Sequence, residues 1–419
     1  RSGYGDHARD LVRAFLKNDK YDIKIWDVPW GETPRNALDV ELDEQIIKRI
    51  LKTPNLKKQP EVYVDIRIPN EFQTWGKVNI GITAGIETDA VSQIWLEGCN
   101  KMDLIIVPSE HSKEGFVKAL YEKIQQMPNG QQQKVGELRL VKPIEALFEG
   151  VDEDVFKPLD TSSLDLVDDI KEDFCFLHVG LWGKGVYESF ANKKEKPALI
   201  LKTNQATFSV IDKEICLERI NKIKSKFPND WELPNIYLLH GSLSSEDMNK
   251  LYNHPKVKSF VSLTHGEGFG RPMLEASMVG LPVITSGWSG HMDFLDKDNS
   301  ILLGGKLVQV PKSQVWKDII IEESKWFDVD ETQSYKALNH CFKNYDIIKN
   351  SALNLMKTNR DKFTLNKMAE KLDEIVSPIT DGVSTQVGLN LPKLKKVGKS
   401  ETPKIKLPKL KNVSKGVTV

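Results

Sequence analysis

Short apolar runs alternate with amphipathic stretches along most of this 419-residue chain, and this alternation restricts the fold more than any other feature. Strands that are apolar on both faces are typical of parallel sheets, whose crossover connections are helices. The alternation comes in two series, separated by the polar, acidic segment 160–173. The chain therefore predicts two α/β domains, which its length also allows.

The first series predicts an N-terminal domain over residues 1–160. Its apolar runs predict strands at 21–28, 61–68, 77–83, 102–109 and 137–142. Its helical spacing predicts helices at 6–18, 43–52 and 112–127.

The second series predicts a C-terminal domain over residues 161–360, with a cleft between the two domains as the natural ligand site. Its strands are expected at 174–180, 197–203, 235–241, 257–264 and 281–286. Helices are expected at 212–227, 244–254 and 330–350. A last helix, within 361–380, is expected to pack back towards the N-terminal domain.

The end of the chain, residues 381–419, predicts an extended, mostly disordered arm. It carries LPKLK twice, at 391–395 and 407–411, and this density of proline blocks helix formation. Residues 391–419 hold nine lysines and one glutamate, a balance of +8. Because the whole chain has no net charge, the folded body must carry about −8.

Bulk features place the protein among soluble, cytoplasmic proteins. The four cysteines have neither CxxC nor metal-site spacing, which favours a reducing compartment and structural thiols. No apolar run approaches the roughly 20 residues that cross a bilayer. The chain begins with Arg1, so a leader or a first strand can precede it.

The stretch HGEGFGR, residues 265–271, is expected to form a turn between a buried strand and a helix. Pro272 suits the first turn of that helix, and Gly280 suits its end. Glycines in such a turn let the backbone come close to a ligand, while free N–H groups and the helix dipole favour an anion. Phosphate is the obvious candidate.

Two carboxylates flank this expected phosphate site. Glu267 lies on the turn and Glu275 in the first helical turn, at the carboxyl end of a strand where α/β folds bind ligands. One carboxylate accepts hydrogen bonds from two adjacent hydroxyls, so the pair suggests a nucleotide sugar. Alternatively, Glu275 merely complements the helix dipole. Glu267 has no such alternative, because a charged residue between glycines at a strand end serves no packing purpose.

The motif, with seven residues between Glu267 and Glu275, resembles the E-x7-E signature of retaining GT-B glycosyltransferases of the GT4 type. The resemblance extends over most of the chain. It includes SGYGDHARDLVRAF, MDLIIVPSEHSKEGF, FEGVDEDVFKP and GSLSSEDMNKLYN. It implies a GT-B fold, with two Rossmann-like domains facing a cleft, a C-terminal helical segment and a disordered basic tail. The overall sequence, including the LPKLK tail, is also similar to glycosyltransferases encoded by large tailed phages, which would place the protein in a host cytoplasm.

The resemblance implies a role for each residue of the motif. Glu275 would hold the ribose hydroxyls and Glu267 would contact the donor sugar, while the backbone at Gly268, Phe269, Gly270 and Arg271 would line the phosphates. The donor would be a nucleotide-diphosphate sugar, with a UDP-sugar as the commonest choice in the family.

Two cations would neutralise the departing diphosphate, and the matching residues are Lys202 and Lys184. The chemistry asks for them because an oxocarbenium-like transition state leaves negative charge on the diphosphate. The connection around Lys184 is short for a parallel crossover, so Lys193, Lys194 or Arg271 are alternatives. No metal cluster is evident, and metal-independent transfer without a cofactor is expected.

Residues from the other side of the cleft complete the prediction. Gly3 and Gly5 would bring a glycine loop near the diphosphate, although such a pair is common in loops. His7, Glu87 and Asp89 are candidates on the acceptor side; alternatively, His7 is structural and Asp89 caps a helix. Wrapping of the donor is expected from the loop residues Ser289, Gly290 and His291, and Trp288 would either stack on a sugar or lie half-buried.

The sequence is compatible with three functions. The first is sugar transfer to an acceptor hydroxyl with retention at the anomeric carbon, with the leaving phosphate assisting because no base stands out. The second is a nucleotide-sugar epimerase on the same fold. The third is nucleic-acid binding through the lysine tail, which has no aromatic residues for base contacts. The tail would also suit recruitment of a polyanionic acceptor, such as DNA with hydroxylated bases or an anionic surface glycan.

Overall fold

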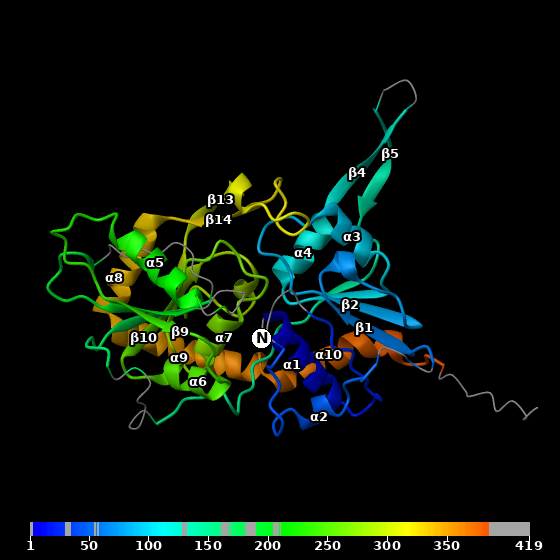
Figure 1. The fold of residues 1–419 in the computed structure, drawn as a ribbon, viewed down its shortest axis with the longest axis horizontal. Coiled ribbons are helices and arrows are strands. Elements are labelled where there is room, and N and C mark those ends of the chain that lie inside the picture. The colour runs from blue at the N-terminus through cyan, green and yellow to red at the C-terminus, as the bar shows by residue number, and fades with distance from the viewer. Residues whose placement is uncertain are drawn as a thin grey trace, which may run out of the picture. The chain divides into compact units, whose positions relative to one another are not determined.

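The computed structural model describes residues 3–29, 35–53, 56, 58–127, 132–160, 167, 169–180, 190–203, 209 and 211–384. Figure 1 shows two lobes, each built on its own parallel sheet. The predicted α/β class with two such lobes is confirmed. The basic tail lies outside the described residues from 385 on.

The N-terminal lobe has a four-stranded parallel sheet in the order β1-β2-β3-β6. Its strands are β1 (Val62–Ile66), β2 (Val78–Ile82), β3 (Leu104–Val107) and β6 (Ile144–Ala146). One face is covered by α1 (Gly3–Lys17) and α10 (Leu365–Thr380), and the other by α3 (Gln93–Cys99) and α4 (Glu110–Lys118). Shorter elements are α2 (Glu44–Ile47) and the 3-10 turn η1 (Pro69–Glu71).

The C-terminal lobe has six parallel strands in the order β12-β11-β10-β7-β8-β9. They are β7 (Cys175–Val179), β8 (Ala198–Thr203), β9 (Ile236–His240), β10 (Val257–Ser262), β11 (Val283–Ser286) and β12 (Ile301–Leu303). From β7 the chain winds outwards through β8 and β9, and in the opposite direction through β10 to β12. This reversal between β7 and β10 is the switch point at which such sheets bind ligands.

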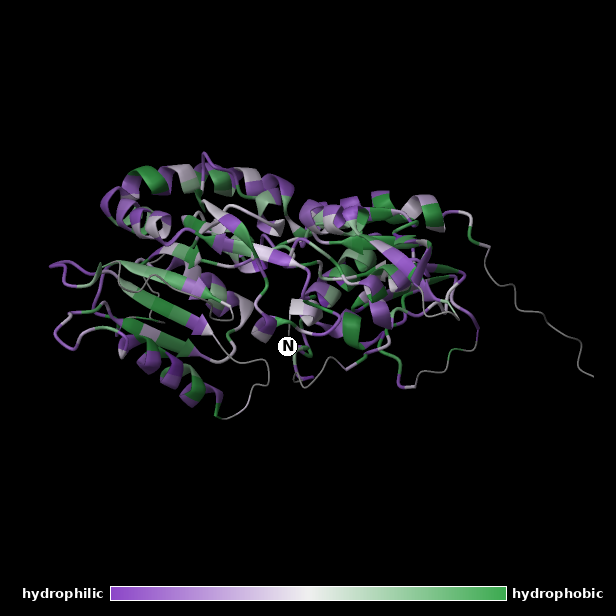
Figure 2. Ribbon diagram, turned by 90° about the horizontal axis from the view of Figure 1, so that it is seen from above, coloured by the Kyte–Doolittle hydropathy of each residue, from purple (hydrophilic) through white to green (hydrophobic). Residues whose placement is uncertain are grey.

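In Figure 2 the strands of the second sheet are largely hydrophobic, and helices enclose them. They are α5 (Asp212–Lys224), α6 (Ser245–Asn253), α7 (Arg271–Met278), α8 (Glu331–Lys343) and α9 (Tyr345–Lys362). A hairpin of β13 (Gly305–Gln309) and β14 (Lys325–Val329) follows β12. The 3-10 turns η4 (Gly290–Asp293) and η5 (Lys312–Gln314) lie in the connections.

The chain crosses between the lobes twice, and the two crossings are hydrogen-bonded to each other. Val151 pairs with Thr364 in a parallel bridge, through backbone bonds of 3.0 Å to Phe363 and 2.9 Å from Leu365. A side chain on Gly150 would meet the Thr364 carbonyl oxygen at 2.7 Å, so only glycine fits there. After this crossing, α10 packs against α1 in the core of the N-terminal lobe.

Four expected elements of the N-terminal lobe differ from the prediction, and one of them is the helix expected at 43–52, of which only α2 (Glu44–Ile47) forms. The segment 21–28 makes only one bridge, between Ile25 and Ile50, because its alternating polar residues leave it half-exposed. Segment 112–127 is not one helix: α4 ends at Lys118 and the chain continues as β4 (Leu120–Gln126). The partner of β4 is β5 (Gln132–Arg139). The strand predicted at 137–142 is therefore part of an antiparallel hairpin instead of the main sheet.

Candidate functional site

The loop after β10 has the strand–turn–helix form that the sequence predicts. Gly270 caps α7 with a φ of 95°, a left-handed conformation that glycine adopts at low cost. Pro272 lies in the first turn, and Gly280 follows the helix end with a φ of 72°. Glu275 is the fifth residue of α7, past the first turn, so complementing the helix dipole does not explain it.

The backbone of this loop is suited to an anion. Among the described residues, none accepts a hydrogen bond from the backbone N–H groups of residues 268–271. These groups lie at the N-terminus of α7, where the helix dipole also favours negative charge. The loop therefore offers both direct donors and a favourable field to a phosphate.

The Glu267 carboxyl group interacts electrostatically with carboxyl groups of the N-terminal lobe. Its backbone is fixed by bonds of 2.9 Å to the Ser289 hydroxyl and 3.0 Å from the Gly290 amide. Burial, followed by the charges of Glu87 and Glu149, raises the pKa of Glu267 to about 8. The protonated form is thus stable near neutral pH unless a positive charge comes close.

Two glycines of the loop touch the opposite lobe. A side chain on Gly266 would meet the Glu87 carbonyl oxygen at 2.1 Å, and one on Gly268 would meet the Ala84 carbonyl oxygen at 2.1 Å. The Ser109 hydroxyl, at the start of α4, also donates to the Gly268 carbonyl oxygen at 2.6 Å. The expectation that these glycines only make room for a ligand is therefore incomplete, because the other lobe already occupies part of that space.

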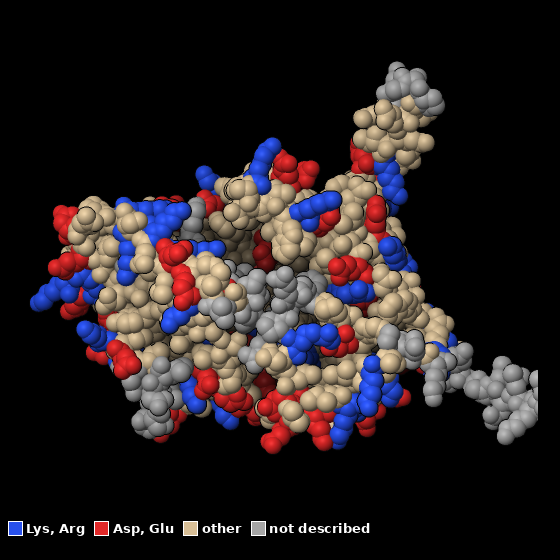
Figure 3. All heavy atoms as spheres, viewed as in Figure 1, with Lys and Arg blue, Asp and Glu red and all other residues tan. Residues whose placement is uncertain are grey.

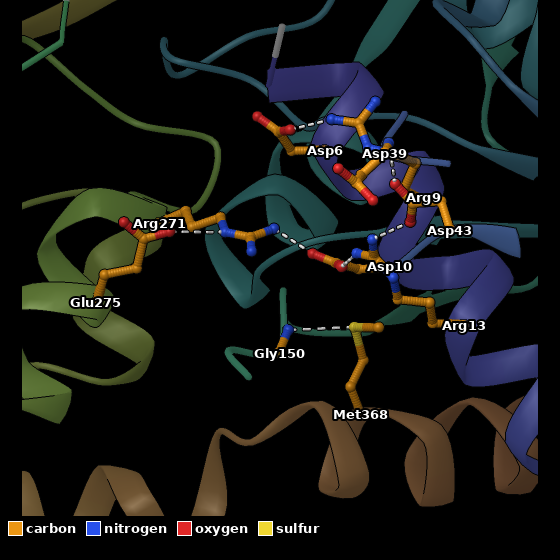
Figure 4. Close-up of polar contacts among 10 residues, drawn as sticks. All are labelled: Asp6, Arg9, Asp10, Arg13, Asp39, Asp43, Gly150, Arg271, Glu275 and Met368. Atoms are coloured by element: carbon orange, nitrogen blue, oxygen red, sulfur yellow. Dashed lines mark hydrogen bonds and ion pairs between the residues drawn. The ribbon is translucent and has the colours of Figure 1, made fainter. Parts of the chain in front are cut away.

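The Glu275 carboxylate belongs to a charged network, drawn in Figure 4. Arg271 donates to it at 3.0 Å, and the Tyr252 hydroxyl donates to its other oxygen at 3.2 Å. Arg271 also pairs with Asp10 on α1. Burial opposes the charge of Arg271, but the carboxylates of Asp10, Glu275 and Glu149 outweigh it and raise its pKa.

Lys202 lies near the carboxyl end of β8, at the same edge as the loop after β10. Its ammonium group donates to the Gly241 carbonyl oxygen at 2.5 Å, and burial lowers its pKa. A nearby anion would oppose this shift and favour the charged form. Lys184 lies outside the described residues. Lys193 and Lys194 precede the amino end of β8, at the opposite edge, so of the alternatives only Arg271 lies in the loop.

The residues predicted at the start of the chain lie on a helix. Gly3 and Gly5 belong to the first turn of α1 rather than to a loop, and Gly3 faces open space. His7 is 2% exposed, and its Nδ1 has no hydrogen-bond partner among the described residues. Burial lowers the pKa of His7 to about 4, so the ring is neutral at pH 7.

The acceptor-side and loop candidates also have local partners. Asp89 is bonded twice to Lys325 of β14, through backbone and carboxylate contacts of 2.9 and 2.6 Å. Trp288 packs between His111 and Phe327, with ring centroids 4.6 and 6.0 Å away, which favours its half-buried alternative. Glu87 is exposed at the surface, but the protein around it partly desolvates its carboxyl group and so raises the pKa of Glu87.

Two residues of this region were missed by the sequence reasoning. Asp10 is hidden in the amphipathic pattern of α1, and only the pairing with Arg271 reveals it. Glu149 follows β6, at the carboxyl end of the first sheet, and that position was the available signal. Burial raises the pKa of Glu149 to about 7, although Arg271 opposes the shift.

Acidic side chains line the bottom of a hollow in the surface near β13 and β14, as Figure 3 shows. No group of three metal-ligating side chains is found in the part of the chain that the structure describes. Across those same residues, no helix is both long and apolar enough to cross a bilayer.

Residues 229–322, which include the loop after β10, match the family model "Glycosyl transferases group 1". These findings support a GT-B glycosyltransferase. No curated protein matches the chain.

Solved glycosyltransferase structures share the fold at low sequence identity. A glycosyltransferase from Rickettsia africae is 13% identical, with a TM-score of 0.58 over 91% of this chain and 96% of that one. Anabaena HepE in complex with UDP-glucose is 17% identical, with a TM-score of 0.51 over 72% and 73%. Sucrose-phosphate synthase from Thermosynechococcus elongatus is 13% identical, with a TM-score of 0.51 over 72% and 68%.

Replacing Glu267 with glutamine should stabilise the protein at pH 8 but not at pH 4. The folded protein keeps a proton on Glu267 up to about pH 8, whereas the unfolded chain releases it near pH 4.5. Protonated Glu267 therefore leaves the free energy of unfolding at its full value below pH 4.5, the pKa of Glu267 in the unfolded chain. This free energy decreases as pH rises from 4.5 towards 8. Melting temperatures from pH 4 to 9 should show a difference that grows up to pH 8 and then levels off. A difference in melting temperature that does not change with pH would contradict the raised pKa of Glu267.

Proposed function

We propose that this protein transfers a sugar from a nucleotide-diphosphate sugar to an acceptor hydroxyl, with retention of the anomeric configuration, as GT4-type enzymes do. One observation carries the proposal: at the switch point of a Rossmann-type sheet, the loop after β10 combines two carboxylates with backbone N–H groups that no described residue accepts a hydrogen bond from. Phosphates suit the N–H groups, and sugar hydroxyls suit the carboxylates.

The roles proposed for the residues follow their positions. The amides of residues 268–271 bind the diphosphate, and Glu275 holds the ribose. Glu267 faces the donor sugar, where its charge stabilises the positive character that develops at the anomeric carbon. Lys202 neutralises the leaving diphosphate, and Lys184 is the second candidate by resemblance. The UDP-glucose complex of Anabaena HepE supports a UDP-sugar as the first donor to try.

The acceptor side is acidic, which bears on the proposed polyanionic acceptor. Glu87 and Glu149 act electrostatically on Glu267, so an acceptor beside it meets a cluster of carboxyl groups. The part of the acceptor that receives the sugar should therefore present hydroxyl groups, and any phosphates of the acceptor should lie further from Glu267. A phage DNA recruited through the basic tail remains compatible with this rule. Truncation after Ser384, beyond α10, should reduce the salt dependence of binding if the tail recruits such a polymer.

A transfer assay tests the proposal and separates it from the epimerase alternative. The protein is incubated with UDP-glucose, alone and with neutral hydroxyl acceptors, and the products are examined by NMR. Retention predicts an α-linked product from the α-linked donor. Conversion of the donor sugar without acceptor would favour the epimerase, and a β-linked product would contradict retention.

A further inference from the structure

We propose that Asp10 is a positioning residue for the transfer reaction: its ion pair with Arg271 latches the N-terminal lobe onto the donor-binding helix α7. The catalytic consequence rests on the proposed function, whereas the latch between the lobes does not. The two parts can therefore fail separately.

The contacts place Arg271 between the two lobes. From α7, its guanidinium group donates to Glu275 at 3.0 Å, and it pairs with Asp10 of α1 on its other side (Figure 4). The side chains of Asp10 and Arg271 are 8% and 21% exposed, so water screens the pair weakly. One cation thus joins the proposed ribose carboxylate to the first helix of the chain.

Asp10 is itself held firmly. Arg13, one turn later on α1, donates to Asp10 at 2.7 Å and to the buried Asp43 at 2.6 Å. The Asp10 carboxylate therefore cannot easily follow Arg271 if the lobes separate. Opening the lobes would break the contact rather than move the whole network.

Charge distinguishes this contact from the others between the lobes. The described residues also join the lobes through Ser109 and Gly268, through Glu110 and Asp293, and through Asp89 and Lys325, but each of these uses backbone groups. In the described part of the chain, Asp10 with Arg271 is the ion pair across the lobes. Losing Asp10 removes one of the two carboxylates paired with Arg271 and leaves its buried charge less compensated, which favours the open form, where water reaches it.

The closed form is the one that assembles the site. It brings the carboxylate-bearing loop after β10 against the 84–87 backbone, beside Glu87 and Glu149 of the N-terminal lobe. The nucleotide, by contrast, is bound by groups of the C-terminal lobe. Weakening the latch should therefore lower turnover more than nucleotide affinity, because a smaller fraction of the protein is closed.

The test compares Asp10→Asn with Asp10→Glu and Asp43→Asn. Dyes on Lys101→Cys and Glu218→Cys, one exposed position in each lobe, report lobe separation by single-molecule FRET; the four native cysteines are buried. Asp43→Asn is the matched control, because it removes a buried carboxylate from Arg13 but leaves the latch. Gly268→Ala, which pushes the loop off Ala84, marks the open state.

Without ligand, Asp10→Asn should shift the FRET distribution towards that of Gly268→Ala, while Asp43→Asn stays at the wild-type value and Asp10→Glu recovers part of the shift. With UDP and UDP-glucose, the Kd of UDP should stay within about threefold, while kcat falls about tenfold. Unchanged FRET in Asp10→Asn would overturn the latch. An open Asp10→Asn protein with no UDP binding in any variant would uphold the latch and instead contradict the proposed function.

Discussion

Replacing Glu267 with glutamine should slow sugar transfer by about 100- to 1,000-fold while changing the Kd of UDP less than about threefold. The reason is that Glu267 is proposed to act on the sugar, where positive charge develops only in the transition state. UDP alone has no sugar and should not sense the change. Initial rates with UDP-glucose, with calorimetric titration of UDP, measure the two effects.

A matched variant separates this effect from general loss of structure. Glu246 is an exposed glutamate in the first turn of α6, on the same lobe, and Glu246→Gln should transfer at the wild-type rate. If Glu267→Gln kept more than about a tenth of the wild-type rate, the proposed role in the transition state would be wrong.

Replacing Glu275 with alanine should raise the Kd of UDP about 100-fold. The ribose hydroxyls are proposed to donate to a charged carboxylate, and such a hydrogen bond contributes about 1.5–3 kcal/mol. Because about 1.4 kcal/mol changes a Kd tenfold, the upper end of this range corresponds to about 100-fold. Arg271 keeps Asp10 as a partner in this variant, so the helix should stay in place. Calorimetric titration of UDP measures the Kd directly.

The exposed Glu218 of α5 provides the control for this second change, because Glu218→Ala also removes a carboxylate from the C-terminal lobe. Its Kd should equal that of the wild type. An equal, small effect of both replacements would show that Glu275 serves only the charged network and not the nucleotide.

The sequence was sufficient for β7 to β11 and for the central loop because these depend on local patterns. Continuous apolar runs identified these five strands, whereas the short strands β6 and β12 were not predicted. Gly270, Pro272 and Gly280 identified the turn and both ends of α7. The hairpin of β4 and β5 was not predicted. Its first strand continues a helical pattern after Lys118, and only pairing with a strand further along the chain overrides that pattern.

The contacts between the lobes could not be predicted, because they join residues far apart in the chain. Nothing in the helical pattern around Asp10 indicates a partner 261 positions later. Similarly, the sequence suggested a need for small residues at Gly266 and Gly268, but it could not show that the neighbour is the 84–87 backbone. Asp89 suited a helix cap, whereas its contacts with Lys325 depend on the β13–β14 hairpin.

A crystal structure of the protein with bound UDP-glucose would show directly whether the loop after β10 binds the donor. We expect the diphosphate within hydrogen-bond distance of the backbone amides of residues 268–271, the ribose hydroxyls on Glu275, and the glucose beside Glu267. Nucleotide bound elsewhere, with the amides of that loop still unoccupied, would contradict this expectation.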